Sequence, residues 1–350
     1  MYGHIASPYL HTRVSLMSRR LATPALIEKA IETPLDQLAP LLAAAGAESL
    51  AAVPGEDLPR SLEQRRLSNL LNDILILARA QHGEHRAFLL YWTHSLELFN
   101  LKAILRGRLN GESATAVRAR LLDMGPFAAL PVEALLRADS EAEVLHLLES
   151  TPFAEFAAQA RRALAERRDP FFIDTVLDRR FYSGLVERAS KVLTSDPAAF
   201  RRLMAALIDG LNFVWLARYR FVYGLPAPET WYLLIPAGYD LRGRHLKRLT
   251  ATENLAALIA ATPRPLGRLL AGAETIEEVA RRVELDLRDI ARGIIDRSVS
   301  GFVRAFCYIL LRSQDLLTLR GVVKAKQLGL SSEVMRAGLL RHIPPGGPHV

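Results

Sequence analysis

ELFNLKAILRGRLNG (residues 97–111) has two counterparts later in the chain, DGLNFVWLARYRFVYG at 209–224 and DLLTLRGVVKAKQLG at 315–329. Each copy begins with an acid and ends with a glycine. An amide or hydroxyl side chain follows the acid by three residues, and basic side chains follow it by nine and eleven. These positions are Glu97, Asn100, Arg106 and Arg108, then Asp209, Asn212, Arg218 and Arg220, then Asp315, Thr318, Lys324 and Lys326. Three copies in the same order indicate an internal repeat.

The spacing within the first copy predicts a helix. Glu97, Leu101, Ile104 and Arg108 fall on one stripe at about 100° per residue, and the other copies repeat this order of acid, apolar, apolar and base. The acid and the base are about 16 Å apart along such a helix, so each must contact another element. We expect the apolar residues to enter the core, the Asn to bond neighbouring groups, and the bases to reach helix ends or interfaces.

The glycines that close the copies, Gly111, Gly224 and Gly329, are expected to be left-handed C-caps. A second marker, Thr-Pro after an apolar stretch, indicates a turn between helices. It occurs at Pro34, Pro152 and Pro263, which precede Asn100, Asn212 and Thr318 by 66, 60 and 55 residues. The distance between the two markers is similar in all three copies, so they belong to one repeat unit that is several helices long.

The repeat predicts three similar helical domains, at residues 1–125, 126–240 and 241–350. Gly125 and Gly238 match at one further position downstream of the first two copies. The third copy is expected to lack this downstream element because the chain is ending. Three like units in one chain suggest a pseudo-threefold body with a central opening.

The composition agrees with an all-α fold. Leu and Ala are abundant, and apolar residues recur at intervals of three and four rather than two. No apolar run approaches the roughly 20 residues that cross a bilayer, and no export signal is visible. The single cysteine, Cys307, is expected to be a buried small hydrophobe, which suits a reducing cytoplasm. The net charge of +8 favours anionic neighbours, although the basic residues look dispersed in pairs.

The sequence contains no constellation typical of an enzyme. It has no phosphate-binding G-x-x-x-x-G-K-(S/T) loop, no G-x-S-x-G elbow and no cysteine cluster. His82, Glu84 and His85 in HGEH are the best metal candidates, but the glycine favours an exposed turn. Asp174 and Asp178 in DTVLDRR lie one helical turn apart, and ion pairing with the adjacent arginines is favoured over acid/base catalysis. We therefore expect no cofactor, no metal and no specific nucleotide binding.

These segments together resemble the C subunit of the archaeal and bacterial V/A-type rotary ATPases, which corresponds to the d subunit of the eukaryotic vacuolar enzyme. The resemblance covers nearly the whole chain. Thr318 replaces an amide that the family usually carries in the third copy, which removes the basis for an Asn-specific contact there. The stretches that carry the resemblance are YLHTRVSLMSRRL near the start, the acid-x-x-Asn-Leu-x-x-(Ile/Leu)-x-Arg motif in copies one and two, DTVLDRRFYSGL, and YILLRSQDLLTLRGVVKAKQLGL.

The resemblance implies a funnel-shaped, all-helical, non-catalytic subunit, present once per complex. It would sit peripherally on the cytoplasmic face of the membrane. There it would bind the proteolipid rotor ring at one end and the D- and F-type shaft subunits at the other. Arg106 and Arg108 would pack between domains, with direct contact to the shaft as the alternative. The rival classes are a basic helical-repeat scaffold for an acidic protein or nucleic acid, which the resemblance disfavours, and an unfamiliar all-α enzyme.

Overall fold

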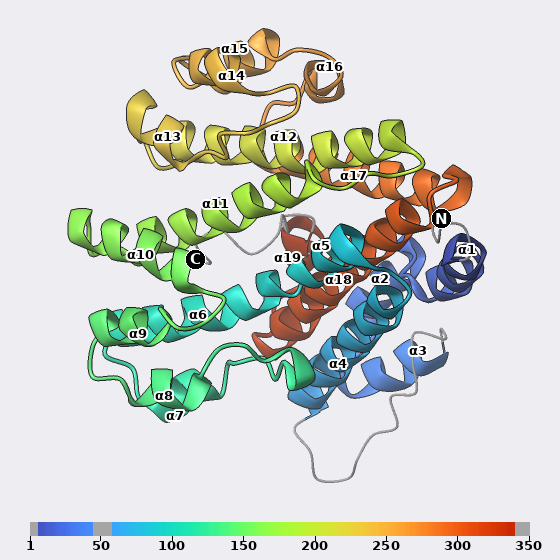
Figure 1. Ribbon diagram of the computed structural model, residues 1–350, viewed down its shortest axis with the longest axis horizontal. Helices are drawn as coiled ribbons and strands as arrows, with labels where there is room; N and C mark the ends of the chain where they lie inside the picture. The colour runs from blue at the N-terminus through green and yellow to red at the C-terminus, as the bar shows by residue number, and fades with distance from the viewer. Residues whose placement is uncertain (1–5, 45–57, 340–350) are drawn as a thin grey trace.

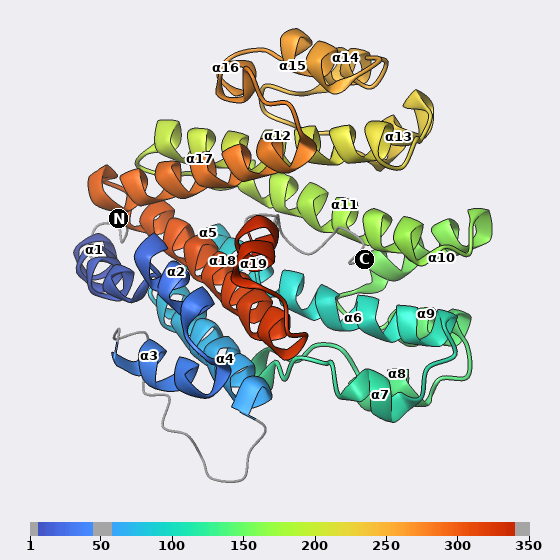
Figure 2. The same ribbon diagram turned by 180° about the vertical axis from the view of Figure 1, so that it is seen from behind.

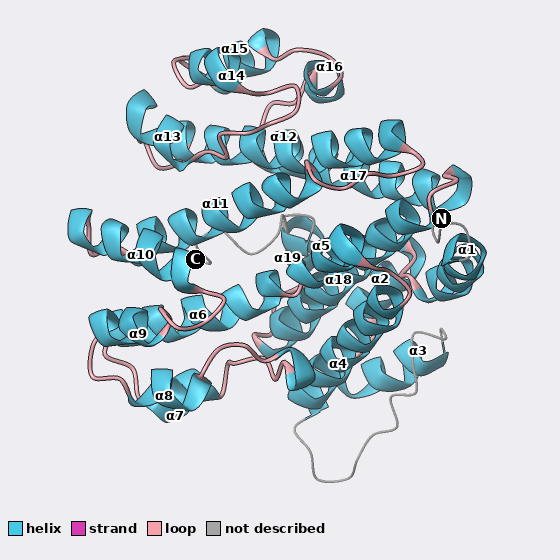
Figure 3. Ribbon diagram, in the orientation of Figure 1, coloured by secondary structure: helices cyan, strands magenta, loops and turns pink. Residues whose placement is uncertain are grey.

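The computed structural model describes residues 6–44 and 58–339. Within these ranges every regular element is a helix, as Figure 3 shows. The prediction of an all-α fold is therefore confirmed. The expected arrangement of three similar domains about a funnel-like cavity stays a prediction.

The helices follow one another in four groups along the chain. The first is α1 (Ala6–Met17), α2 (Pro24–Glu32), α3 (Leu38–Ala44), α4 (Leu58–Arg79) and α5 (Gly83–Tyr91). The second is α6 (His94–Leu109), α7 (Ala114–Arg118), α8 (Val132–Arg137), α9 (Glu141–Leu147), α10 (Ala154–Glu166) and α11 (Pro170–Ala189). The third is α12 (Pro197–Phe221), α13 (Ala227–Leu233), α14 (Gly243–Leu249), α15 (Leu255–Ala261), α16 (Leu266–Leu270) and α17 (Ile276–Arg297), and the last is α18 (Gly301–Gln327) and α19 (Ser332–Leu339).

The first repeat segment lies in α6, and the second and third form the C-terminal halves of α12 and α18; we call these three the motif helices. The glycine at the end of each adopts a positive φ, 68° at Gly111 and 66° at both Gly224 and Gly329. Glycine has no Cβ and enters this left-handed region at little cost, so it ends the helix there. Gly111 and Gly329 directly follow the C-cap residues of α6 and α18, as predicted, whereas Gly224 lies three residues beyond the end of α12 at Phe221. The three Thr-Pro markers follow α2, α9 and α15 and lie in turns between helices, as expected.

Each motif helix packs against at least one long helix, and α18 packs against α17 and α1 as well as α4. Helix α11 packs on α6, α17 on α12, and α4 on α18 (Figures 1 and 2). Helix α18 is buried on all sides from Gly301 to Leu316, and its sequence there is accordingly apolar around most of its circumference. Cys307 is fully buried within this stretch, as expected. A single hydrophobic cluster extends from Leu10 to Leu316.

The two ends of the described chain lie side by side. Helix α1 packs along α18, and α2 contacts both α18 and α19. Polar contacts reinforce this packing: His11 Nε2 lies 3.0 Å from the carbonyl oxygen of Val299, and Arg292 Nη2 donates to the carbonyl of Ala22 at 2.9 Å. Short helices occupy the periphery, with α7–α9, α14–α16 and α2–α3 lying at three separate places (Figures 1 and 2).

Candidate functional site

The acid that opens each repeat segment accepts hydrogen bonds from backbone amides of a separate segment. Glu97 Oε1 accepts from the amide of Ala129 at 2.9 Å. Asp209 accepts from the amides of Tyr239 and Asp240 at 2.8 and 2.6 Å. Burial raises the pKa of both Glu97 and Asp209, and the backbone amides oppose this rise because they stabilise the ionised form. These carboxylates hold the backbone of the segment that follows their own helix.

The Asn of the first two copies makes a pair of hydrogen bonds to one residue. Asn100 donates to the carbonyl of Leu122 at 2.8 Å and accepts from its amide at 2.7 Å. Asn212 does the same with Ile235, at 3.0 and 2.9 Å. Only an amide side chain offers a donor and an acceptor at this spacing. Thr318 instead donates to Gln314 in its own helix, at 2.9 Å.

The last base of each copy donates to a backbone carbonyl. Arg108 donates to Leu136 in the last turn of α8, and Lys326 donates to Ile31 in the last turn of α2 at 2.6 Å. Arg220 donates to Leu225 at 2.6 Å, which follows the C-cap of its own helix. Unpaired carbonyls at helix ends favour cations, so the contacts of Arg108 and Lys326 complete the short helices α8 and α2.

The earlier base of each copy behaves differently from one copy to the next. Arg106 Nη2 lies 2.7 Å from Asp174 Oδ2 of α11. Arg218 is half-buried and Lys324 is exposed. Neither makes an ion pair with a carboxylate of the described residues. The acids and the last bases are therefore engaged in all three copies, whereas the earlier base forms an ion pair only in the first.

The third copy obtains its partner segment from the start of the chain. Asp315 Oδ2 accepts from the amide of Ala22 at 2.7 Å, and Lys326 reaches Ile31. In the first two copies the equivalent segment lies downstream, so the sequence suggested that the third copy lacks it. The sequence did not foresee that residues 22–31, near the start of the chain, supply the partners of Asp315 and Lys326 instead.

A buried ionic cluster joins α6 to α11. Lys102 forms an ion pair with Asp178, and each side chain is 2% exposed. Asp174, which pairs with Arg106, lies beside them. Burial raises the pKa of Asp178 to about 7, and the Lys102 ammonium opposes this rise. Ion pairing of Asp174 and Asp178 was expected, but with the arginines that follow them in sequence; their partners are instead on α6.

Lys102 was missed because a cation at this position does not recur in all three copies. The corresponding residues are Val214 in the second copy and Arg320 in the third. Arg320 pairs with Glu63 of α4 at 2.5 Å. The signal that could have found Lys102 is a lysine two residues after Asn100, within an otherwise apolar run.

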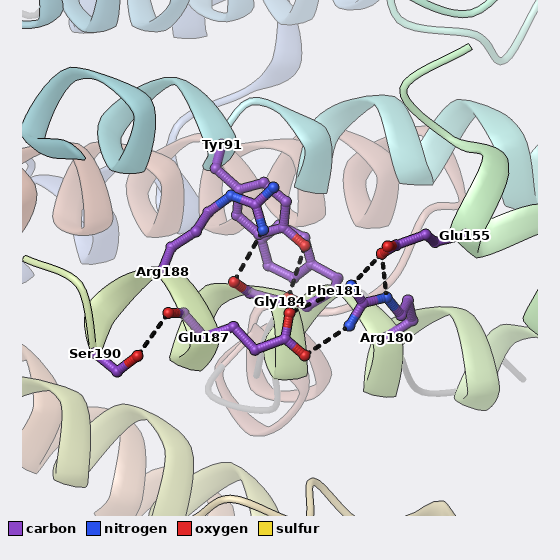
Figure 4. Close-up of polar contacts among 8 residues, drawn as sticks. All are labelled: Tyr91, Glu155, Arg180, Phe181, Gly184, Glu187, Arg188 and Ser190. Carbon is purple, nitrogen blue, oxygen red and sulfur yellow. Dashed lines mark hydrogen bonds and ion pairs between the residues drawn. The ribbon is translucent and has the colours of Figure 1, made fainter. Parts of the chain in front are cut away.

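The stretch DTVLDRRFYSGL also builds the junction between α5, α10 and α11, shown in Figure 4. Tyr91 stacks on Phe181, with 5.3 Å between ring centroids, and donates from its hydroxyl to the carbonyl of Phe181 at 3.1 Å. The guanidinium of Arg188 lies 3.8 Å from the centroid of the Tyr91 ring. Arg180 bridges Glu155 of α10 and Glu187 of α11. Gly184 allows Tyr91 to approach, because an added Cβ would lie 2.3 Å from its hydroxyl.

The HGEH segment takes part in packing. His85 stacks on Phe302 with centroids 4.5 Å apart, and its Nε2 lies 2.6 Å from the carbonyl of Leu193. His82 and Glu84 are exposed. Residues 6–44 and 58–339 contain no group of three or more His, Cys, Asp or Glu side chains placed to hold a metal ion. In the same part of the chain, no helix combines the length and the apolar character needed to cross a membrane.

The comparisons with known proteins point to one family. The sequence profile described as ATP synthase (C/AC39) subunit matches residues 10–338. Relatives named as the C subunit of an A-type ATP synthase include those of Haloferax volcanii, 24% identical over 82% of each chain, and Thermococcus kodakarensis, 24% identical over 80% of this chain and 74% of the relative. The Methanosarcina barkeri protein of the same name is 21% identical over 75% of this chain and 72% of its own length.

The match spans all three motif helices and the segments that their side chains hold. The resemblance inferred from the repeat is confirmed, and the chain belongs to the ATP synthase (C/AC39) subunit family of rotary A/V-type ATPases.

Proposed function

We propose that this chain is a non-catalytic central-stalk subunit, the socket that joins the rotating shaft of a rotary ATPase to the membrane-embedded proteolipid ring. In this proposal it binds D- and F-type shaft subunits at one end and the ring at the other. One copy is present per complex, at the cytoplasmic face. The observation that carries the proposal is the family match over residues 10–338.

The packing supports a mechanical role. A subunit that passes torque between two partners must resist deformation, and a close-packed interior transmits strain with little compression. Here one hydrophobic cluster extends from α1 to α18, and polar contacts fix backbone segments to each motif helix. The contact between the chain ends adds stiffness, since Asp315 ties α18 to the segment that begins α2.

The three-domain division remains part of the proposal. Its boundaries lie near residues 125 and 240, and residues 22–31 would complete the third domain. Superposition of α6, α12 and α18 with the segments that they hold is the test. Equivalent positions for Asn100, Asn212 and Thr318 would support the division, and unrelated positions would refute it.

Binding to the shaft tests the socket proposal directly. Charge complementarity steers association, so the association rate should fall between low and physiological salt, where the Debye length is about 8 Å. A mainly apolar socket should keep its dissociation rate nearly constant. Rates measured against purified D- and F-type shaft subunits give the answer. No shaft binding, together with salt-sensitive binding to nucleic acid or to an unrelated acidic protein, would favour the scaffold alternative.

A further inference from the structure

One group of short peripheral helices is strongly basic. Residues 242–270, which contain α14, α15 and α16, carry six Lys or Arg residues and one acid, Glu253. We call this segment the basic lobe. It lies at one edge of the molecule, beyond α12, in both views (Figures 1 and 2). Its cations are Arg242, Arg244, Lys247, Arg248, Arg264 and Arg268.

The lobe presents its cations to solvent. All six are exposed, whereas Leu246 and Leu249 of α14 are buried at 0% and 1%. None of the six forms an ion pair with a carboxylate of the described residues. The one polar contact among them is between Arg248 Nη2 and His245 Nδ1, at 3.0 Å. Four cations therefore crowd into seven residues, 242–248, without a neutralising partner.

The other two groups of peripheral helices carry only a small excess of acids. The segment containing α8 and α9, residues 132–147, carries four acids and one cation, Arg137. Helix α2 carries Glu28 and Glu32 against Lys29. Arginines of neighbouring helices pair with these acids, as Arg118 of α7 does with Glu133 and Arg336 of α19 with Glu28. The body is thus basic at one place on its periphery and acidic or balanced at the other two.

The chemistry of the lobe fits a diffuse anionic surface. Stable protein interfaces centre on buried aromatic or large apolar anchors, and no large apolar side chain between residues 242 and 270 is exposed. Arg264 lines a cavity beside α12 and α17, but Arg242, Arg244, Lys247 and Arg248 lie on or next to the short helix α14 and are exposed. Flexible exposed cations of this kind recognise density of negative charge, such as that of acidic phospholipid headgroups. The lack of exposed apolar residues means that no side chain is available for insertion among acyl chains.

We propose that the basic lobe binds the headgroups of anionic phospholipids at the membrane surface next to the rotor ring. This inference rests on the proposed function only for its closeness to the membrane. The contact is electrostatic, so the lobe is able to slide over lipids as the subunit turns. Residues 132–147 and helix α2 carry only one cation each, so the charge asymmetry selects which side of the body faces lipid.

The test uses the full-length chain and two types of vesicle, phosphatidylcholine alone and phosphatidylcholine mixed with phosphatidylglycerol. The chain should float with the mixed vesicles at low salt and not with phosphatidylcholine alone. Changing Arg242, Arg244, Lys247 and Arg248 together to Gln should lower the binding constant on the order of a hundredfold, because each cation near an anionic surface strengthens binding by roughly fivefold and not all four reach it at once.

A matched variant controls for net charge. Arg79, Arg86, Arg162 and Lys191 are exposed, lie outside the lobe and have no ion pair within the described residues. Changing these four to Gln removes the same charge and should cause a far smaller loss. Equal losses in the two variants, or equal binding to both types of vesicle, would overturn the proposal.

Shaft binding, measured on the same proteins, separates this inference from the proposed function. A wild-type chain that binds the shaft but not anionic vesicles refutes the lipid contact alone. A chain that binds anionic vesicles through the lobe but not the shaft refutes the socket role alone. If the lobe variant keeps vesicle binding but loses the shaft, the lobe serves an acidic protein and the lipid proposal is wrong.

Discussion

The carboxylate of Asp315 in α18 accepts a hydrogen bond from the backbone amide of Ala22, 2.7 Å away and 293 residues earlier in the chain. The other carboxylate oxygen lies 3.0 Å from Arg288 Nη2 of α17. Asp315 is fully buried. One side chain therefore links the last motif helix to its neighbour and to the start of α2.

Replacing Asp315 with Asn should loosen the chain ends. The substitution leaves the guanidinium of Arg288 without its buried partner, and loss of one member of a buried ion pair costs about 3 kcal/mol or more. Hydrogen exchange should accelerate in residues 22–32, and the urea midpoint should fall. Asp240→Asn is the control, since its pair with Arg201 is largely exposed and is worth about 1 kcal/mol at most. Unchanged exchange in residues 22–32 would contradict this role of Asp315.

Replacing Asn212 with Leu should destabilise the second repeat. The amide and carbonyl of buried Ile235 would both lose their partner, at a cost of about 2 to 4 kcal/mol in the free energy of unfolding. Asn100→Leu should act in the same direction. Thr318→Val should cost less, because Thr318 bonds only to its own helix. Urea unfolding of the three variants gives the comparison. An unchanged stability with lost assembly of the complex would mean that the Asn side chains serve a partner instead.

Gly184→Ala should weaken the junction between α5 and α11. The new Cβ would lie 2.3 Å from the hydroxyl oxygen of Tyr91, and overpacking of this kind costs about 1 to 3 kcal/mol. In a Tyr91→Phe background the cost should shrink, as a double-mutant cycle would show. Gly293→Ala in α17 is the control, since its Cβ comes no closer than 3.7 Å to any atom and Ala favours a helix. Equal effects in the two backgrounds would rule out the Tyr91 contact as the cause.

Glu284 should make the protein less stable as the pH rises. Burial raises the pKa of Glu284 to about 8, against 4.5 as its ordinary value, and the charge of Arg288 only partly opposes this. Between these two pH values the folded chain holds a proton that the unfolded chain has released, so its stability contribution falls by roughly 1.4 kcal/mol per pH unit. This contribution of Glu284 to the free energy of unfolding is fully present below pH 4.5 and is lost as the pH rises through 8.

Glu284→Gln should remove this component and stabilise the protein at alkaline pH relative to wild type. Urea unfolding at pH 6 and pH 9 measures the difference between the two proteins. A difference that does not change with pH would show that Glu284 does not titrate in this range.

The sequence predicted more of the local structure than of the long-range contacts. The stripe spacing and the closing glycines located the motif helices and their ends, because both follow from helix geometry. The partners of Asn100 and Asn212 were foreseen only as neighbouring groups. Asp315 could not be matched to Ala22, because the repeat pattern places partner segments downstream and this one is upstream.

Charge was also harder to read than periodicity. The basic residues looked dispersed in pairs along the chain, yet Arg242, Arg244, Lys247 and Arg248 form one exposed surface. The pair between Lys102 and Asp178 joins two helices that the sequence alone does not place side by side. In both cases the missing information is which faces of the helices meet or remain free.

The central proposal is that this protein couples the shaft to the ring. The most direct measurement is ATP-driven proton pumping by vesicles that hold the complex without this chain, before and after the purified chain is added back. We predict that ATP hydrolysis without the chain drives no pumping, and that adding the wild-type chain restores it. Full coupled pumping in its absence would contradict the coupling role.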